Sequence, residues 1–169
     1  YDEIGPDGIL QNEEGERLSF ELSFSKHPVV EAMLLRLKEE AKLAGVEFRL
    51  SGMDGAAAFQ KVLRKVHEIA FAAWGVGQPM VPDFYQQFHS KEAYEKDGKT
   101  LKLMTNNISV YADPEVDPIL ERNRNATTLE EVIETSRNLE RTFHEEAVWV
   151  PAYKRAYYRV GHWRWIRWP

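Results

Sequence analysis

The chain has 169 residues, of which 43% are hydrophobic and 29% are charged, and these proportions are ordinary for a soluble globular domain. This length supports one domain with a substantial core and is short for two. The net charge of −5 gives the chain as a whole no electrostatic basis for binding nucleic acid. The sequence has no cysteine, which excludes disulfides, thiol nucleophiles and cysteine-based zinc sites. Its apolar runs all fall well short of the roughly 20 residues that span a bilayer.

The N-terminal part of the sequence predicts strands that alternate with helices. Residues 1–16 are polar and rich in turn-forming residues, so we expect an irregular start. Strict alternation of apolar and polar residues over 18–25 predicts a strand with one buried face. A helix is expected to begin at Pro28 and to end at Gly45, which is placed as a C-cap, and residues 46–50 predict a second strand.

A second helix and a third strand follow in the predicted order. Asp54 is placed to cap a helix that runs through Val66. Residues 69–74 form a short apolar run that fits a buried strand. Helices between successive strands favour parallel pairing with covered sheet faces, so the sequence indicates an α/β fold.

The second half of the sequence predicts a long loop-rich segment and then helices. Residues 75–112 have weak periodicity and several glycines and prolines, and so long a loop in a compact domain is usually functional. Asp113 as N-cap and Pro114 at the first helical position predict one helix. Thr128 begins a predicted capping box for the next helix, and residues 148–151 predict a short strand.

Motifs for catalysis are missing from the sequence. His67 and His144 both lack the second histidine four residues later that a zinc protease needs. There is no Gly-x-Ser-x-Gly nucleophile elbow, and the two glycines of residues 75–77 lack the third glycine of a phosphate-binding loop. We therefore assign no catalytic residue, metal or cofactor. With 27 carboxylates in the chain, a hydrolase with an unrecognised carboxylate pair stays an alternative, although nothing in the sequence selects such a pair.

The C-terminal stretch differs in composition from the rest. From Lys154 onward every charged residue is basic, and five aromatic residues are interleaved with them: Tyr157, Tyr158, Trp163, Trp165 and Trp168. Such a segment suits stacking on single-stranded nucleic acid, a membrane surface, or packing against another domain. We favour packing against another domain because the rest of the chain is acidic.

The order of these segments matches a known pattern. The strand Leu18–Phe24, its helix and the strand Gly45–Leu50 are followed by an apolar run that ends in Trp74 and Gly75. Residues 111–117 then read Tyr-Ala-Asp-Pro-Glu-Val-Asp, and the stretch ending at Pro151 reads Ala-Val-Trp-Val-Pro. In this order the segments resemble the C-terminal lobe of bacterial extracellular solute-binding proteins of family 5, the receptors of peptide and nickel ABC transporters. The ending, residues 159–169, looks most like the branch that includes microcin C and related oligopeptide-binding proteins.

The resemblance implies a fold and a role. The fold would be the C-terminal lobe of a periplasmic-binding-protein-like fold (type II, cluster C), with a mostly parallel sheet flanked by helices. Residues 1–150 would form the ligand-binding lobe, and residues 151–169 would return toward an N-terminal lobe that this chain lacks. The protein would be a periplasmic or other extracytoplasmic receptor and not an enzyme, delivering a peptide-like solute to a membrane permease. The lobe alone would expose apolar surface and would be able to self-associate.

Four residues are the candidates for ligand contact. Trp74 offers a flat apolar face with one N–H donor, and Gly75 allows the backbone to approach a peptide closely. Asn106 and Asn107 both donate and accept hydrogen bonds, as peptide amides require. Peptide-binding members of the family carry an aspartate just after this tryptophan, which pairs with the amino terminus of the peptide. Here no carboxylate follows until Asp83, so we expect a blocked, longer or non-peptide ligand.

Overall fold

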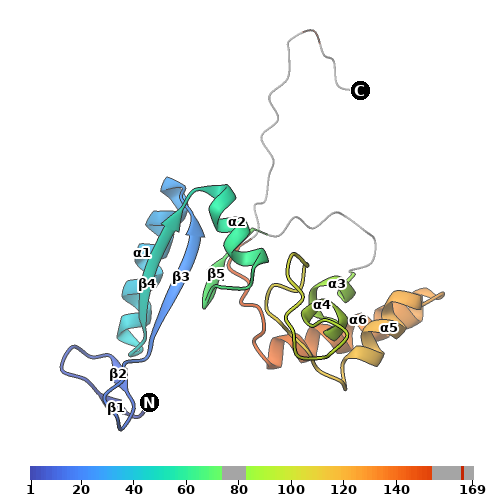
Figure 1. Cartoon of the computed structure of the whole chain (residues 1–169), viewed down its shortest axis with the longest axis horizontal. Coiled ribbons are helices and arrows are strands. Elements are labelled where there is room, and N and C mark those ends of the chain that lie inside the picture. Colours follow the sequence, from blue (N-terminus) through green and yellow to red (C-terminus); the bar gives the residue numbers. More distant parts are fainter. Residues whose placement is uncertain (74–82, 154–164, 166–169) are drawn as a thin grey trace.

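The structure is a computed structural model that describes residues 1–73, 83–153 and 165. It forms a sheet unit (residues 1–73) and a helical unit (residues 83–153) that lie side by side (Figure 1). The elements in chain order are β1 (Glu3–Ile4), β2 (Leu10–Gln11), β3 (Ser19–Ser25), α1 (Pro28–Leu43), β4 (Glu47–Met53), α2 (Gly55–Leu63), β5 (Ile69–Phe71), α3 (Tyr85–Phe88), α4 (Ser90–Ala93), α5 (Asp117–Asn125) and α6 (Leu129–Glu145). Among the described helices, none is both long and apolar enough to cross a membrane.

The sheet has three strands in the order β4-β3-β5, and both neighbours run parallel to the central strand β3. Leu22 lies at the centre of this arrangement, opposite Leu50 on one side and Ile69 on the other. Because α1 and α2 connect the strands, the predicted β-α-β-α-β order and parallel pairing are confirmed. The predicted α/β fold is therefore the fold of the sheet unit.

The alternation along β3 separates an apolar face from a polar one. Leu22 and Phe24 are buried and pack against Leu34 of α1, whose side chain has no exposed surface. Partly buried side chains of both neighbouring strands and of α1 complete this core: Val30, Met33, Phe48, Leu50, Ile69 and Phe71. Glu21 takes the alternate position along β3 and forms an ion pair with Lys61 of α2.

The N-terminal hairpin is anchored on the end of α1. The predicted irregular start contains two short antiparallel strands, β1 and β2. Gly45 ends α1 with a φ of 81°, as predicted, and its carbonyl accepts a hydrogen bond from the backbone N–H of Leu10 at 2.8 Å. A Cβ on Gly45 would lie 2.6 Å from Cγ of Leu10, so the turn requires glycine both for its backbone angle and for its space.

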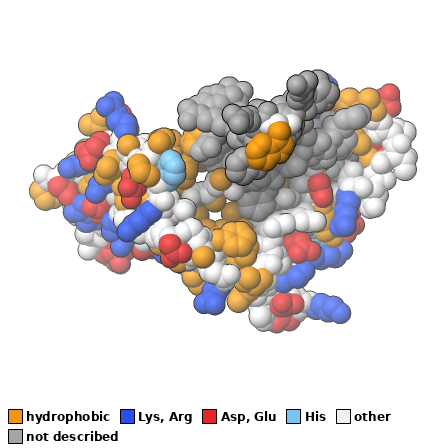
Figure 2. Space-filling view, turned by 90° about the horizontal axis from the view of Figure 1, so that it is seen from above, with side chains coloured by type: hydrophobic (Ala, Val, Ile, Leu, Met, Phe, Trp, Pro, Cys, Tyr) orange, Lys and Arg blue, Asp and Glu red, His pale blue; other side chains and the backbone are white. Residues whose placement is uncertain are grey.

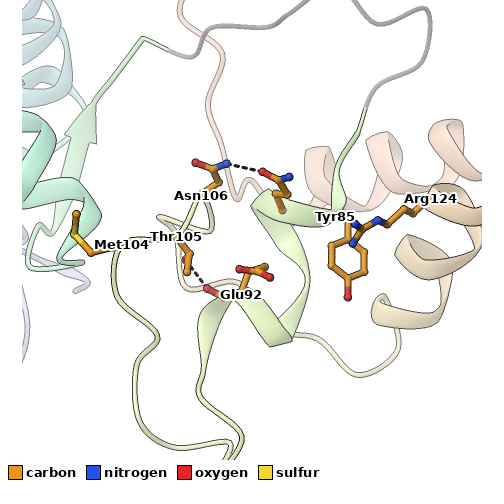
Figure 3. A pocket seen from close by; sticks show the side chains of 7 residues that line it. Tyr85, Glu92, Met104, Thr105, Asn106 and Arg124 are labelled. Atoms are coloured by element: carbon orange, nitrogen blue, oxygen red, sulfur yellow. Dashed lines mark hydrogen bonds between the residues drawn. The ribbon is translucent and has the colours of Figure 1, made fainter.

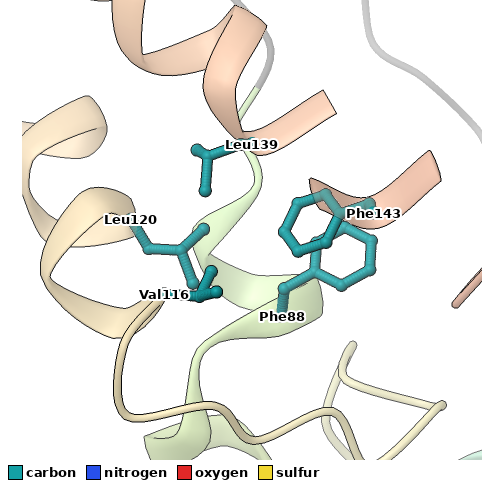
Figure 4. Packing of buried hydrophobic residues seen from close by; sticks show 5 residues of the cluster. All are labelled: Phe88, Val116, Leu120, Leu139 and Phe143. Carbon is teal, nitrogen blue, oxygen red and sulfur yellow. The ribbon is translucent and has the colours of Figure 1, made fainter. Parts of the chain in front are cut away.

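The helical unit has its own apolar core (Figure 4). Phe88 of α3 and Phe143 of α6 stack with ring centroids 3.8 Å apart and an angle of 21° between the rings. The buried residues of this cluster come from α3, α5, α6 and the turn before α5: Phe88, Val116, Leu120, Leu139 and Phe143. The helices α3, α5 and α6 are therefore held together by aromatic and aliphatic packing.

Several predicted elements differ from the structure. The helix predicted to run through Val66 ends at Leu63, and the segment predicted to be loop-rich, 75–112, contains the short helices α3 and α4.

The helix predicted to begin at Pro114 begins three residues later, at Asp117. The carboxylate of Asp113 accepts from the N–H of Glu115 at 2.8 Å, and its carbonyl accepts from Val116 and Asp117, both at 3.1 Å. Asp113 and Pro114 therefore open a turn ahead of the helix, and Pro118 takes the early helical position.

The prediction of a strand at residues 148–151 was wrong. Ala147 ends α6 with a φ of 49°, and this left-handed residue redirects the chain. Val148 and Trp149 then pack against the core of the helical unit. Their apolar character thus reflects burial on helices, which a short apolar run alone does not distinguish from a strand. The predicted cap of α6 is confirmed, because Oγ1 of Thr128 accepts from the N–H of Glu131 at 3.3 Å.

The two units are joined by hydrogen bonds at one segment. Lys65, just after α2, donates from Nζ to the carbonyls of Glu92 at 3.1 Å and of Ala93 at 3.4 Å. The N–H of Met104 donates to the carbonyl of Leu63 at 2.9 Å. Burial lowers the pKa of Lys65. These contacts tie the end of α2 to the end of α4 and to the loop that follows it.

Candidate functional site

The predicted ligand residues fall in two groups. Trp74 and Gly75 lie outside the residues that the structure describes. Asn106 and Asn107 lie in the loop between α4 and α5, but they have opposite environments. Asn106 is exposed and its Nδ2 donates to Oε1 of Gln86 at 2.7 Å, whereas Asn107 has no exposed surface.

The amide of Asn107 holds the loop together. Its Nδ2 donates to the carbonyl of Tyr111 at 2.8 Å and to the carbonyl of His89 at 3.2 Å. Its Oδ1 accepts from the N–H of Tyr111 at 2.9 Å. Three of its four hydrogen-bonding positions are thus occupied. Ligand contact by Asn107 stays a prediction, and this contact would require the side chain to leave these partners.

Asn106 lines a pocket of about 320 Å³ (Figure 3). The pocket lies where α3, α4, the loop before α5 and the end of α5 meet, and its lining is mostly polar: Tyr85, Gln86, Glu92, Met104, Thr105, Asn106 and Arg124. Of these, sequence reasoning identified only Asn106. The other lining residues are spread along the chain from Tyr85 to Arg124, and no sequence motif includes them.

A cation stacked on an aromatic ring forms one wall of the pocket. Cζ of Arg124 on α5 lies 4.3 Å from the ring centroid of Tyr85 on α3. A cation at this distance over an aromatic ring is stabilised by about 0.5–1 kcal/mol at an exposed site. In the described part of the chain, Arg124 forms no ion pair. Its edge N–H donors are therefore open to a bound group.

The carboxylate in the pocket is already paired. Oε2 of Glu92 lies 3.1 Å from Nζ of Lys102. The carbonyl of Glu92 accepts from Oγ1 of Thr105 at 2.6 Å and from Lys65. The carboxylate is thus neutralised by a neighbouring lysine, and its backbone fixes the position of the loop that carries Asn106.

The ring of Tyr85 packs against the ring of a buried histidine, His89. The centroids of Tyr85 and His89 are 4.3 Å apart. Nδ1 of His89 accepts from the N–H of Lys91 at 3.1 Å, and Nε2 lies 3.3 Å from Oε1 of Glu121. Since Nδ1 is an acceptor, Nε2 carries the proton and donates to Glu121 in the neutral ring. His89 therefore links the start of α4 to α5 under the pocket.

Metal-ligand clusters and shifted pKa values bear on catalysis. The described residues hold no cluster of three or more metal-ligating side chains. The carboxyls of Asp7, Glu21, Asp97 and Glu121 have lowered pKa values, chiefly from hydrogen bonds, and that of Asp97 is lowered to about 2. A general acid needs the opposite shift, a raised pKa.

Acidic and basic side chains are interspersed on the molecular face that Figure 2 shows. Nearly all of the basic-aromatic segment predicted to pack on another domain lies outside the described residues.

No protein-family model and no curated protein matches this chain. Solved structures do match it. The oligopeptide-binding protein AppA from Bacillus subtilis, in complex with a nonapeptide, superposes with a TM-score of 0.71 at 18% identity over 87% of this chain and 27% of its own. NikZ from Campylobacter jejuni, in complex with Ni(L-His), gives a TM-score of 0.68 at 22% identity over 86% and 28%.

This chain has the fold of one part of these two binding proteins. A third match is the periplasmic binding protein DppA from Helicobacter pylori, in complex with the peptide STSA, with a TM-score of 0.64 at 18% identity over 79% and 25%. The resemblance expected from the sequence is therefore confirmed at the level of the fold, a parallel sheet flanked by helices. The chain spans about a quarter of the length of these solved solute-binding proteins.

Proposed function

We propose that this chain forms one lobe of the receptor of an ABC transporter, and that the receptor captures a peptide-like solute. The observation that carries the proposal is the superposition of 87% of the chain on a receptor that holds a nonapeptide. Other matching structures hold a pentapeptide and the peptide STSA. The role is one of binding and release, without chemical conversion of the solute.

The mechanism follows from a two-lobed receptor. Residues 1–150 are the ligand-binding lobe, and residues 151–169 lead back to a second lobe, against which their basic and aromatic side chains pack. Solute binds between the lobes, and its contacts with both favour the closed state, which is a hinge motion coupled to binding. The closed receptor, outside the cytoplasmic membrane, then delivers the solute to the permease.

A peptide-like solute suits the described pocket better than a metal complex does. Gln86 and Asn106 present amide groups that donate to and accept from a peptide backbone. Structures with Ni(L-His) and Fe(III)-EDTA also match the chain, so the metal complex is the competing ligand class. The sequence between Gly75 and Asp83 has no carboxylate to pair with a free amino terminus, which favours a blocked or longer peptide.

The test uses the longer protein that the reading frame around this chain encodes. Calorimetric titration with N-acetylated peptides of three to nine residues is compared with titration with Ni(L-His)2, on the longer protein and on the 169-residue chain. We expect the longer protein to bind the peptides and the chain alone to bind them far more weakly, since closure needs both lobes. Equal affinity of both proteins would refute the two-lobed mechanism. If only the nickel complex binds, the proposed ligand class is wrong and the ligand is a metal complex.

A further inference from the structure

The pocket beside Asn106 is lined by one arginine and one glutamate, and only the glutamate has an ion-pair partner in the described residues. Arg124 lines the pocket without an ion pair in the described residues, and the only carboxylate of the lining, Glu92, is paired with Lys102. Lys65 adds a further cation at the backbone of Glu92, at 3.1 Å from its carbonyl. The lysines lie outside the lining and offset the charge of Glu92, which leaves the guanidinium of Arg124 as the unpaired charge of the described lining, so the pocket favours an anion.

Arg124 is held at Tyr85 by a cation–π contact, with Cζ 4.3 Å from the ring centroid. No side-chain hydrogen bond or ion pair of Arg124 occurs within the described residues, so its N–H donors are open to a bound group. Two parallel N–H donors on one edge match the two oxygens of a carboxylate. The ring of Tyr85 is itself held by the buried His89 beneath it, so the guanidinium is preorganised.

The amide pair lies in the same pocket (Figure 3). Nδ2 of Asn106 donates to Oε1 of Gln86 at 2.7 Å, which leaves Oδ1 of Asn106 as an acceptor and Nε2 of Gln86 as a donor. A peptide amide offers one donor and one acceptor, and both side chains of the pair are exposed. The pocket therefore presents a carboxylate site and a peptide-amide site together.

We propose that Arg124, stacked on Tyr85, binds the carboxylate at the acidic end of the solute, while Asn106 and Gln86 bind the adjoining amide. The inference rests on the proposed function and makes it more specific: the solute is a peptide-like acid, held by its carboxylate where a free amino terminus has no partner. Arg124 is then a specificity-determining residue, because an uncharged solute of the same shape forms no ion pair with it.

Two probes that differ only in charge test the inference. Acetyl-trialanine with a free carboxylate and acetyl-trialanine amide are titrated into the 169-residue chain at low salt, and chemical shifts of backbone and side-chain N–H groups are followed by NMR. We expect the acid to shift the side-chain signals of Arg124, Asn106 and Gln86 in a saturable way, and to bind about five- to tenfold more tightly than the amide. Arg124→Gln removes this preference, and Arg124→Lys, which keeps the charge without the paired donors, retains part of it.

Arg137→Gln is the matched control, since Arg137 is an exposed helical arginine outside the pocket, on α6. It leaves the preference for the acid unchanged. Equal binding of both probes, shifts spread over other surfaces, or no saturable shift would overturn the inference. The same variants in the longer protein distinguish this inference from the proposed function. If Arg124→Gln still binds the solute normally, the receptor function stands and the carboxylate site at Arg124 is refuted. If the preference for the acid depends on Arg124 but the longer protein has no transport activity, the carboxylate site stands and the receptor function is refuted.

Discussion

Replacing Asn107 by alanine removes a buried side chain that bridges three backbone groups. The lost hydrogen bonds join Asn107 to the N–H and carbonyl of Tyr111 and to the carbonyl of His89, at 2.8 to 3.2 Å. At about 1 kcal/mol for each bond, the free energy of unfolding falls by about 3 kcal/mol. The buried backbone groups left without a partner make this a lower bound, unless water enters the space.

Urea denaturation followed by circular dichroism measures this loss. In a chain of this size, 3 kcal/mol corresponds to a fall in Tm of about 6–12 °C. The neighbouring variant Asn106→Ala is the control, because Asn106 is exposed and its side chain has one hydrogen bond, to Gln86. We expect its free energy of unfolding to stay within about 0.5 kcal/mol of the unmodified chain. Equal effects of the two variants, or a loss below about 1 kcal/mol for Asn107→Ala, would refute the structural role of Asn107.

Three further predictions concern the backbone turns, a helix cap and a surface carboxylate. Gly45→Ala lowers the free energy of unfolding by about 2 kcal/mol or more, because its Cβ meets a side chain of β2, whereas Gly8→Ala, with a φ of 85° and open space, costs about 1 kcal/mol; both are measured by urea denaturation. Asp54→Ala removes the cap of α2 and costs about 1 kcal/mol, and an unchanged midpoint would contradict this role. The pKa of Asp97, about 2, rises toward 3.8 in the variant Thr100→Val, as followed by NMR titration, because the hydroxyl of Thr100 is the largest cause of the shift. Since this pKa is lowered in the folded chain, the contribution of Asp97 to stability is present above pH 4 and is lost as the pH falls toward 2.

The sequence predicts best where local pattern and tertiary packing agree. Alternation along residues 18–25 predicted the central strand and its apolar face with Leu22 and Phe24, and both were confirmed, but Ser23 on the opposite face is buried too. Asp54 and Thr128 were correctly predicted as caps, because an oxygen on a short side chain satisfies free N–H groups whatever the helix packs against. The end of α1 at Gly45 was also predicted correctly, since a backbone with a positive φ strongly favours glycine.

Sequence reasoning failed where long-range packing decides the outcome. In the apolar run at residues 148–151, Val148 and Trp149 pack on the helical core while Val150 is exposed, and the run pairs with no strand in the described chain. Its composition is compatible with a strand as well as with packing on helices. The pocket depends on Arg124 meeting Tyr85 and on Gln86 meeting Asn106, contacts between residues 39 and 20 positions apart that no local pattern encodes. Trp74 and Gly75 stay predictions, as does ligand contact by Asn106.

The central strand of the sheet is also the first of its three strands in the sequence. β4 and β5 pair on either side of β3, and neither pairs with the other. When the chain leaves the ribosome, each later strand of the described sheet finds its partner β3 already synthesised, and this sheet grows outward from the middle. Among the strands that the structure describes in this sheet, neither β4 nor β5 has to wait for β3 to be synthesised. The helical unit, with its separate core, follows last along the chain, so its assembly does not interrupt the growth of the sheet.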